Sequence, residues 1–199
     1  MRTLTLLICL LAPATIALAQ DKPAAVPSSQ DKPAAVATSQ NNPLSAWNKR
    51  AYGAVQHILL STAEKVPEEN YKFKPTDAVR SFGQILGHLA DSQYYFCSVA
   101  LGEKNPAPKI EQTKTSKIDL IAALKAAFAY CDKAYDGMTD ASGTQMVKLF
   151  GGEDTPKLDV LTVNQMHNLE HYGNLVTYMR LKNIVPPTSE PGFQPVPKK

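Results

Sequence analysis

Three histidines carry the most distinctive chemistry in the sequence. His167 and His171 are four residues apart in a segment with helical periodicity, so their imidazole rings lie on one face, about one turn apart. His88 lies on the core-facing stripe of a second helical segment. Two histidines at this spacing can bind one metal ion, as they do on zinc-binding helices. Three histidine ligands leave a coordination position open, which is typical of catalytic rather than closed structural sites.

The same pattern has an ordinary structural explanation. Two histidines four apart are often surface or capping residues, and a single histidine on an apolar face is usually hydrogen-bonded in the core. Burying three imidazoles is costly unless each has a partner, and one shared metal would satisfy all three. A fourth histidine, His57, is excluded because it falls on the side of its segment away from the apolar seam. We therefore expect a divalent metal on His88, His167 and His171.

Polar side chains in phase with these histidines are expected to orient the rings or to line the pocket around them. Asp91 and Ser92 follow His88 by about one turn, and either could orient its ring. Glu170 projects to a different side of its helix, so a solvated charge is the favoured interpretation. The full expected set of surrounding residues is Asp91, Ser92, Tyr95, Asn164 and Asn174.

Four segments with helical periodicity must position these groups. The fourth is apolar around much of its circumference and is expected to be the most buried. The first has apolar residues at three- and four-residue steps, including Leu44, Trp47, Val55 and Ile58. No convincing alternating strand pattern is present. The predicted class is an all-α four-helix bundle with helices over about residues 44–64, 79–101, 117–138 and 158–182.

The two ends of the chain differ in composition from the bundle, which is expected over residues 43–185. Residues 1–19 have a short positive start, an apolar run and small residues at the end, which predicts a cleaved secretory signal. Residues 20–42 contain the tandem repeat DKPAAVPSSQ and DKPAAVATSQ, which predicts a disordered tether. Residues 186–199 form a proline-rich tail. These features predict export to the periplasm or the extracellular space, with no stable membrane anchor.

Net charge and cysteine content bear on the partners of the protein and on the state of its thiols. The 199-residue chain has a formal net charge of only +3, scattered along the sequence, so nothing favours nucleic acid as a partner. Removal of the signal leaves two cysteines, Cys97 and Cys131. They could pair in an oxidising compartment or remain two separate buried thiols, and the sequence does not give their separation.

Two of the helical segments resemble the signature helices of the DinB-like (DinB/YfiT-type) metalloprotein superfamily. These are SFGQILGHLADSQYYF over 81–96 and MHNLEHYGNLVTYMRLKNIVPP over 166–187, and the linker over 66–82 is also similar. The resemblance covers roughly residues 43–190 and implies a bundle with up-down-down-up topology. It also implies a metal triad at His88, His167 and His171. The sequence departs from the family pattern after the last histidine, with Tyr172 in place of a basic residue and Asn174 in place of glutamine.

The resemblance also suggests what such a metal would do. Relatives include thiol-dependent transferases and isomerases, which implies a metal-dependent transferase or hydrolase acting on an unknown small molecule. An exported chain would meet little of a cytosolic thiol, so a non-catalytic metal- or ligand-binding bundle is the alternative, and whether the protein is an enzyme is left open. Zinc is the default expectation for the metal, with nickel or iron as alternatives. Family members are often dimers, so a homodimer is also considered.

Overall fold

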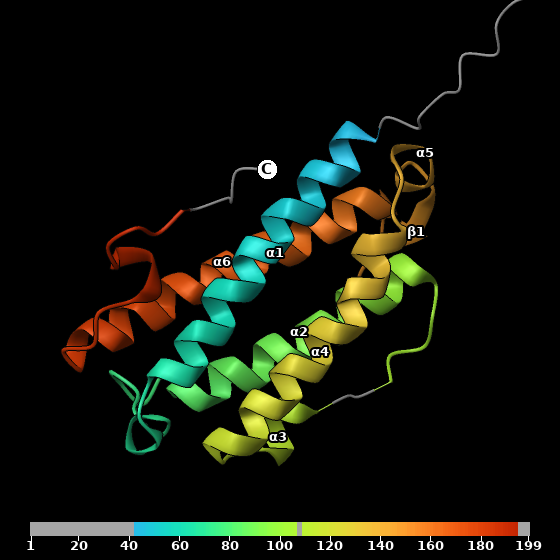
Figure 1. Cartoon of the computed structure of the whole chain (residues 1–199). Helices are drawn as coiled ribbons and strands as arrows, with labels where there is room; N and C mark the ends of the chain where they lie inside the picture. Colours follow the sequence, from blue (N-terminus) through green and yellow to red (C-terminus); the bar gives the residue numbers. More distant parts are fainter. Residues whose placement is uncertain (1–41, 107–108, 195–199) are drawn as a thin grey trace, which may run out of the picture. The chain divides into compact units, whose positions relative to one another are not determined.

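The computed structural model describes residues 42–106 and 109–194, and the expected secretory signal and nearly all of the expected tether lie outside them. Four long helices dominate the described part of the chain, which confirms the predicted all-α class (Figure 1). The elements are, in order, α1 (Pro43–Lys65), η1 (Glu68–Asn70), α2 (Phe82–Leu101), α3 (Ile110–Thr113), α4 (Lys117–Gly137), α5 (Asp140–Gly143), β1 (Met146–Lys148), β2 (Asp154–Pro156), α6 (Lys157–Leu181) and η2 (Pro187–Ser189).

The ends of the long helices follow from local sequence signals. Ser81 and Gln84 form a reciprocal capping box at the start of α2, which satisfies two backbone N–H groups. Gly102 ends α2 in the left-handed conformation at φ 74°, which glycine adopts without steric cost. Ser116 caps α4 by accepting a hydrogen bond from the N–H of Asp119.

The long helices pack so that α1 and α2 each contact both α4 and α6. The start of α1 meets α5, which begins three residues after the end of α4, and there the Asp140 carboxylate accepts hydrogen bonds from the Ser45 N–H and hydroxyl at 2.8 and 2.9 Å. The end of α6 meets the start of α2, where the Tyr178 hydroxyl donates to the Arg80 carbonyl at 2.8 Å. Helix α1 therefore runs antiparallel to α4, and α6 antiparallel to α2. This packing brings the middle of α2 against the middle of α6.

The predicted apolar seam of α1 is confirmed at Val55 and Ile58, which are buried, but not in the first two turns of the helix. Leu44 and Trp47 were expected on the apolar seam, but they are 62% and 55% exposed. The inward position in the first turn is the small polar Ser45, which is buried because Asp140 satisfies it. A pattern of apolar residues cannot identify a serine that is buried through a hydrogen bond, so the sequence predicts Leu44 and Trp47 on the buried face instead.

Helix α6 is also more exposed than predicted. Met166, Leu169 and Leu181 are 65%, 49% and 57% exposed, so the apolar residues on its outer face do not enter the core. Its buried face instead includes the polar residues Asn164 and Asn168. These two side chains are buried because they join a hydrogen-bonded layer with Gln93 of α2.

A short hairpin between α5 and α6 was not predicted. Its strands β1 and β2 pair antiparallel, with Val147 opposite Thr155. Strands of three residues are too short to show an alternating pattern, and Met146 of β1 is 56% exposed. The hairpin places the turn that contains Phe150 beside α2, where Tyr95 contacts it.

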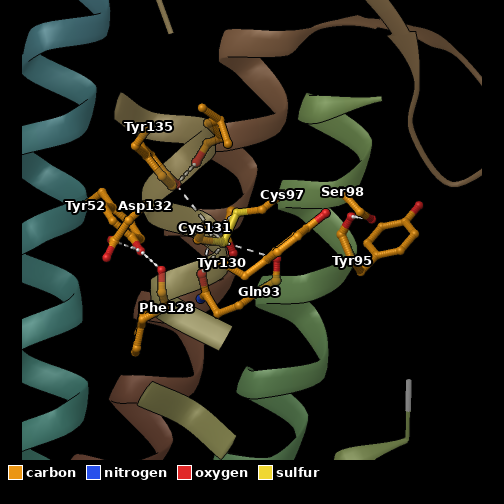
Figure 2. The surroundings of a disulfide bond; sticks show 12 residues. Tyr52, Gln93, Tyr95, Cys97, Ser98, Phe128, Tyr130, Cys131, Asp132 and Tyr135 are labelled. Carbon is orange, nitrogen blue, oxygen red and sulfur yellow. Dashed lines mark hydrogen bonds between the residues drawn. A yellow bond between two sulfur atoms is a disulfide. The ribbon is translucent and has the colours of Figure 1, made fainter. Parts of the chain in front are cut away.

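A disulfide bond between Cys97 and Cys131 links α2 to α4 (Figure 2). The two Cα atoms are 5.2 Å apart and both side chains are fully buried. The Asn164 amide lies beside this bond and donates hydrogen bonds to Gln93 and to the Tyr135 hydroxyl. The pairing that the sequence left open is therefore formed within the bundle.

The proline-rich tail begins against the bundle as far as it is described. Pro186 and Pro187 are buried, and the Tyr172 hydroxyl hydrogen-bonds the Thr188 hydroxyl at 2.9 Å. Glu190 forms an ion pair with Lys65 of α1. None of the helices in the described residues is long and apolar enough to cross a membrane.

Candidate metal centre

The three predicted histidines meet where α2 crosses α6. His88 projects from α2, and His167 and His171 project from successive turns of α6. The Nε2 atom of His167 lies 3.1 Å from that of His88 and 3.2 Å from that of His171. One ligand nitrogen from each of the three lies within 4.8 Å of the others. His167 is therefore the central member of the cluster.

This spacing fits three nitrogens around one small cation. Tetrahedral zinc with bonds of about 2.0–2.1 Å to histidine separates neighbouring ligand nitrogens by roughly 3.3 Å. The two short Nε2–Nε2 distances, 3.1 and 3.2 Å, are close to that value. Within the described residues, the buried Nδ1 atom of His167 has no hydrogen-bond partner. The Nε2 atom of the same ring faces the other two histidines and is the atom available to a shared cation.

Burial holds the three imidazoles in the neutral form that metal binding requires. Burial and the neighbouring His171 and His88 lower the pKa of His167 to about 4. Burial also lowers the pKa of His88, aided by Arg80 and opposed by Glu111. The pKa of His171 is lowered by burial and by His88. All three rings are uncharged at neutral pH, so their lone pairs are available to a cation.

The structure identifies Glu111 as a partner of His88 that the sequence analysis missed. Its Oε2 atom lies 3.3 Å from Nδ1 of His88, while Arg80 donates to its Oε1 atom at 2.8 Å. A carboxylate at Nδ1 fixes the tautomer that leaves Nε2 free, and it raises the basicity of the ring. Glu111 thus orients the imidazole from the side opposite the cluster.

Asp91 acts on this arrangement indirectly rather than by contacting His88 as predicted. Its carboxylate accepts hydrogen bonds from the N–H groups of Ile110 and Glu111 at 2.7 and 2.9 Å, which anchors α3 on α2. Gly87 allows α3 to lie this close to α2, because a Cβ atom at that position would come within 2.7 Å of the Glu111 Cα. A glycine inside a helix, directly before His88, was the available signal for this close contact.

The other expected neighbours lie in different places. The Ser92 hydroxyl donates to the His88 carbonyl at 2.8 Å, one turn back along α2. The Asn174 amide nitrogen lies 3.5 Å from Nδ1 of His171, so it is positioned at that ring. The Tyr95 hydroxyl accepts a hydrogen bond from the Phe150 N–H.

Asn164 belongs to the polar layer beside the disulfide rather than to the histidine cluster. His57 is exposed on α1, as predicted.

Two clefts reach the histidines from different sides. His88 and His167 line one of about 380 Å³, together with Tyr95, Phe96 and Phe150. His171 lines the other, of about 880 Å³, whose walls include Arg80, Glu111 and Asn174. Both volumes lie in the range of small-molecule pockets. The cluster is therefore accessible to a ligand as well as to an ion.

Acidification is expected to destabilise the metal-free protein between about pH 6.5 and pH 4. The folded-state pKa of His167 lies below its ordinary value of 6.5, so the unfolded chain binds more protons across this window. The stability associated with the neutral His167 ring is fully present above pH 6.5 and is lost as the pH falls towards 4. Urea unfolding in EDTA at pH 7.5, 5.5 and 4.5 measures this change. His57→Gln should retain the wild-type decline and His167→Gln should reduce it, whereas equal declines in both variants would contradict this assignment.

A helical bundle with three converging histidines between two clefts defines a class of candidate metal-binding proteins, and comparisons with known proteins place the chain within one family. The sequence model of the DinB superfamily matches residues 51–175. The protein belongs to the DinB superfamily, as the resemblance of its two histidine-bearing helices indicated.

Individual relatives are distant. The uncharacterized protein YjoA of Bacillus subtilis (strain 168) is 25% identical over 121 residues, which cover 59% of this chain and 77% of YjoA. The crystal structure of a DinB-like protein from Bacillus cereus ATCC 10987 superposes with a TM-score of 0.59 at 17% identity, over 72% of this chain and 93% of that one. The crystal structure of YjoA gives a TM-score of 0.57 at 18% identity, over 76% and 96% of the two chains. At these identities the structural likeness establishes the fold alone.

Proposed function

We propose that His88, His167 and His171 bind one divalent metal ion, with zinc as the first choice and nickel or iron as alternatives. The observation that carries this proposal is the convergence of three uncharged imidazoles from two helices, with one ligand nitrogen of each within 4.8 Å of the others. Imidazole nitrogen suits all three metals, so the donor set favours a transition metal over calcium or magnesium.

We infer that the ion serves a small molecule rather than only the fold. Three protein ligands leave room for a fourth, and the clefts on the two sides of the cluster give that position access to solvent. A bound metal there would supply Lewis acidity, which supports hydrolysis or the transfer of a thiol-bearing group. Glu111 would keep His88 oriented, and the neutral rings would retain the ion at physiological pH. The proposed activity is that of a metal-dependent hydrolase or transferase.

We also propose that the mature protein is exported. The expected secretory signal of residues 1–19 carries this inference. The Cys97–Cys131 disulfide supports it, because disulfides persist in oxidising compartments and are rare in the cytosol. Fractionation of cells that express the full-length chain tests this proposal. Export predicts a shortened chain beginning near Gln20 outside the cytoplasm, whereas a full-length cytoplasmic product would refute it.

The functional proposal is tested by metal analysis combined with an activity screen. The mature chain is purified without a metal-affinity tag, loaded with zinc, nickel or iron(II), and screened against ester, amide and thiol-transfer substrates before and after EDTA. The expected result is one metal per chain and a turnover that disappears with the metal and returns on reloading. A large loss of thermal stability without any turnover would instead support a structural ion.

Replacing Glu111 is expected to weaken metal binding without removing a ligand. Glu111→Ala removes the carboxylate at Nδ1 of His88, and loss of such a partner typically lowers metal affinity by about 10- to 100-fold. Glu111→Gln should have a smaller effect, because the amide oxygen can still accept the Nδ1–H. Competition titration with a chromophoric chelator measures the affinities. Glu64→Ala removes an exposed carboxylate from α1, on which no metal ligand is proposed, and is the matched control; an effect as large as that of Glu111→Ala would contradict this role.

A further inference from the structure

The smaller cleft beside the histidines has an aromatic wall built from two separate parts of the chain. Tyr95 and Phe96 come from α2, and Phe150 comes from the turn between β1 and β2. The cleft has a volume of about 380 Å³, and His88 and His167 also line it. A ligand in this cleft would therefore contact aromatic rings and the proposed metal site at the same time.

Phe150 occupies a position that neither burial nor backbone preference explains. Its side chain is 71% exposed, so it adds little to the core. Its φ is 53° and that of Gly151 is 69°, and the Gly152 N–H closes the turn by donating to the Leu149 carbonyl at 3.0 Å. Turns with two positive φ values favour Asn, Asp or Gly, because a large side chain is unfavourable in this region. A phenylalanine here is costly for the fold.

The ring of Phe150 is nevertheless held in place. The Phe150 N–H donates to the Tyr95 hydroxyl at 2.7 Å, and the two rings stack with centroids 5.4 Å apart and planes inclined by 15°. Phe150 also meets Phe96 edge-on at 5.9 Å, and Phe96 lies 5.7 Å from the His167 ring. These contacts form a continuous aromatic path from the hairpin to the central histidine.

We propose that this path is a binding subsite for an aromatic ring of the small-molecule ligand, and that Phe150 is its main specificity-determining residue. The proposal rests on the proposed metal site, because the ligand's polar group would reach the ion while its ring contacts Phe150 and Phe96. The larger cleft suits the polar part of a ligand, since Arg80, Glu111 and Asn174 line it. We therefore expect the aromatic ring of the ligand to lie in the smaller cleft, which His167 lines.

A pair of simple metal-binding probes tests the subsite. Benzohydroxamate and acetohydroxamate carry the same metal-binding head and differ in a phenyl ring against a methyl group. Their affinities for the zinc-loaded mature protein are measured by calorimetry in wild type and in Phe150→Gly, a variant that suits the positive φ and preserves the turn. Trp47→Ala removes another exposed aromatic ring, on α1, and serves as the matched control.

The subsite predicts a preference for benzohydroxamate of about tenfold in wild type, in the range that aromatic stacking contributes. Phe150→Gly should reduce this preference to about twofold by weakening benzohydroxamate binding more than acetohydroxamate binding, while Trp47→Ala should keep the wild-type ratio. Tyr95→Phe, which loses the hydroxyl that fixes the turn, should give an intermediate ratio. An equal ratio in wild type and Phe150→Gly would overturn the subsite while leaving the metal site intact. Failure of the protein to load zinc would overturn both.

Discussion

Replacing His167 with alanine is expected to abolish stoichiometric metal binding by the mature protein. His167 is the central ligand, since its Nε2 lies 3.1 Å from that of His88 and 3.2 Å from that of His171. The two remaining rings belong to different helices and would provide only two nitrogens. The loss should exceed the roughly 10- to 100-fold effect of removing an outer partner such as Glu111. Metal content after dialysis and a competition titration against a chelator measure this change.

The matched control for this substitution is His57→Ala. His57 is an exposed histidine on α1, on which no metal ligand is proposed, so its removal alters the histidine count without altering the cluster. We expect His57→Ala to retain one metal per chain with wild-type affinity. A similar loss in both variants would indicate nonspecific binding to surface histidines, and an unchanged affinity in His167→Ala would refute the triad.

Removal of the disulfide should produce the largest change in stability. Cys97 and Cys131 are separated by 34 residues, and the loop-entropy model assigns a crosslink of this length about 4 kcal/mol. For a domain of this size, that loss corresponds to a melting temperature lower by roughly 10 °C. The variant Cys97→Ala/Cys131→Ala keeps the site apolar and is compared with wild type by urea unfolding. Both proteins should still fold, because the long helices bury their core residues without the bond.

Reductant separates the effect of the bond from that of the lost sulfur atoms. Wild type unfolded and refolded in a phosphine reductant should move towards the double variant, whereas the double variant should not respond to reductant. Wild-type protein that unfolds at the same urea concentration with and without reductant would show that the bond does not form or does not contribute.

The four long helices were predictable because their limits are encoded locally. The expected segment over 117–138 corresponds to α4 at Lys117–Gly137, where Ser116 caps the first turn. The segment over 79–101 began three residues too early, since the capping box places the start of α2 after Ser81. Side-chain burial was less predictable where polar residues point inward. Ser45 on α1 and Asn164 on α6 are buried because distant partners satisfy them, and periodicity carries no information about those partners.

The candidate site shows the same division between local and distant information. The three histidines were found from spacing and from the resemblance of their helices to a known family. Glu111 was not found, because it reaches His88 from a separate four-residue helix whose position depends on Asp91 and on the space above Gly87. Phe150 was missed for a related reason, since its hairpin strands are too short to give a sequence signal.

The most direct test of the account is an anomalous diffraction map of the zinc-loaded mature protein, recorded above and below the zinc absorption edge. We predict one strong peak per chain that lies about 2.0–2.1 Å from a ring nitrogen of each of His88, His167 and His171. The peak should be present only in data collected above the edge. A map without a peak among these three histidines, from protein soaked in excess zinc, would contradict the central claim.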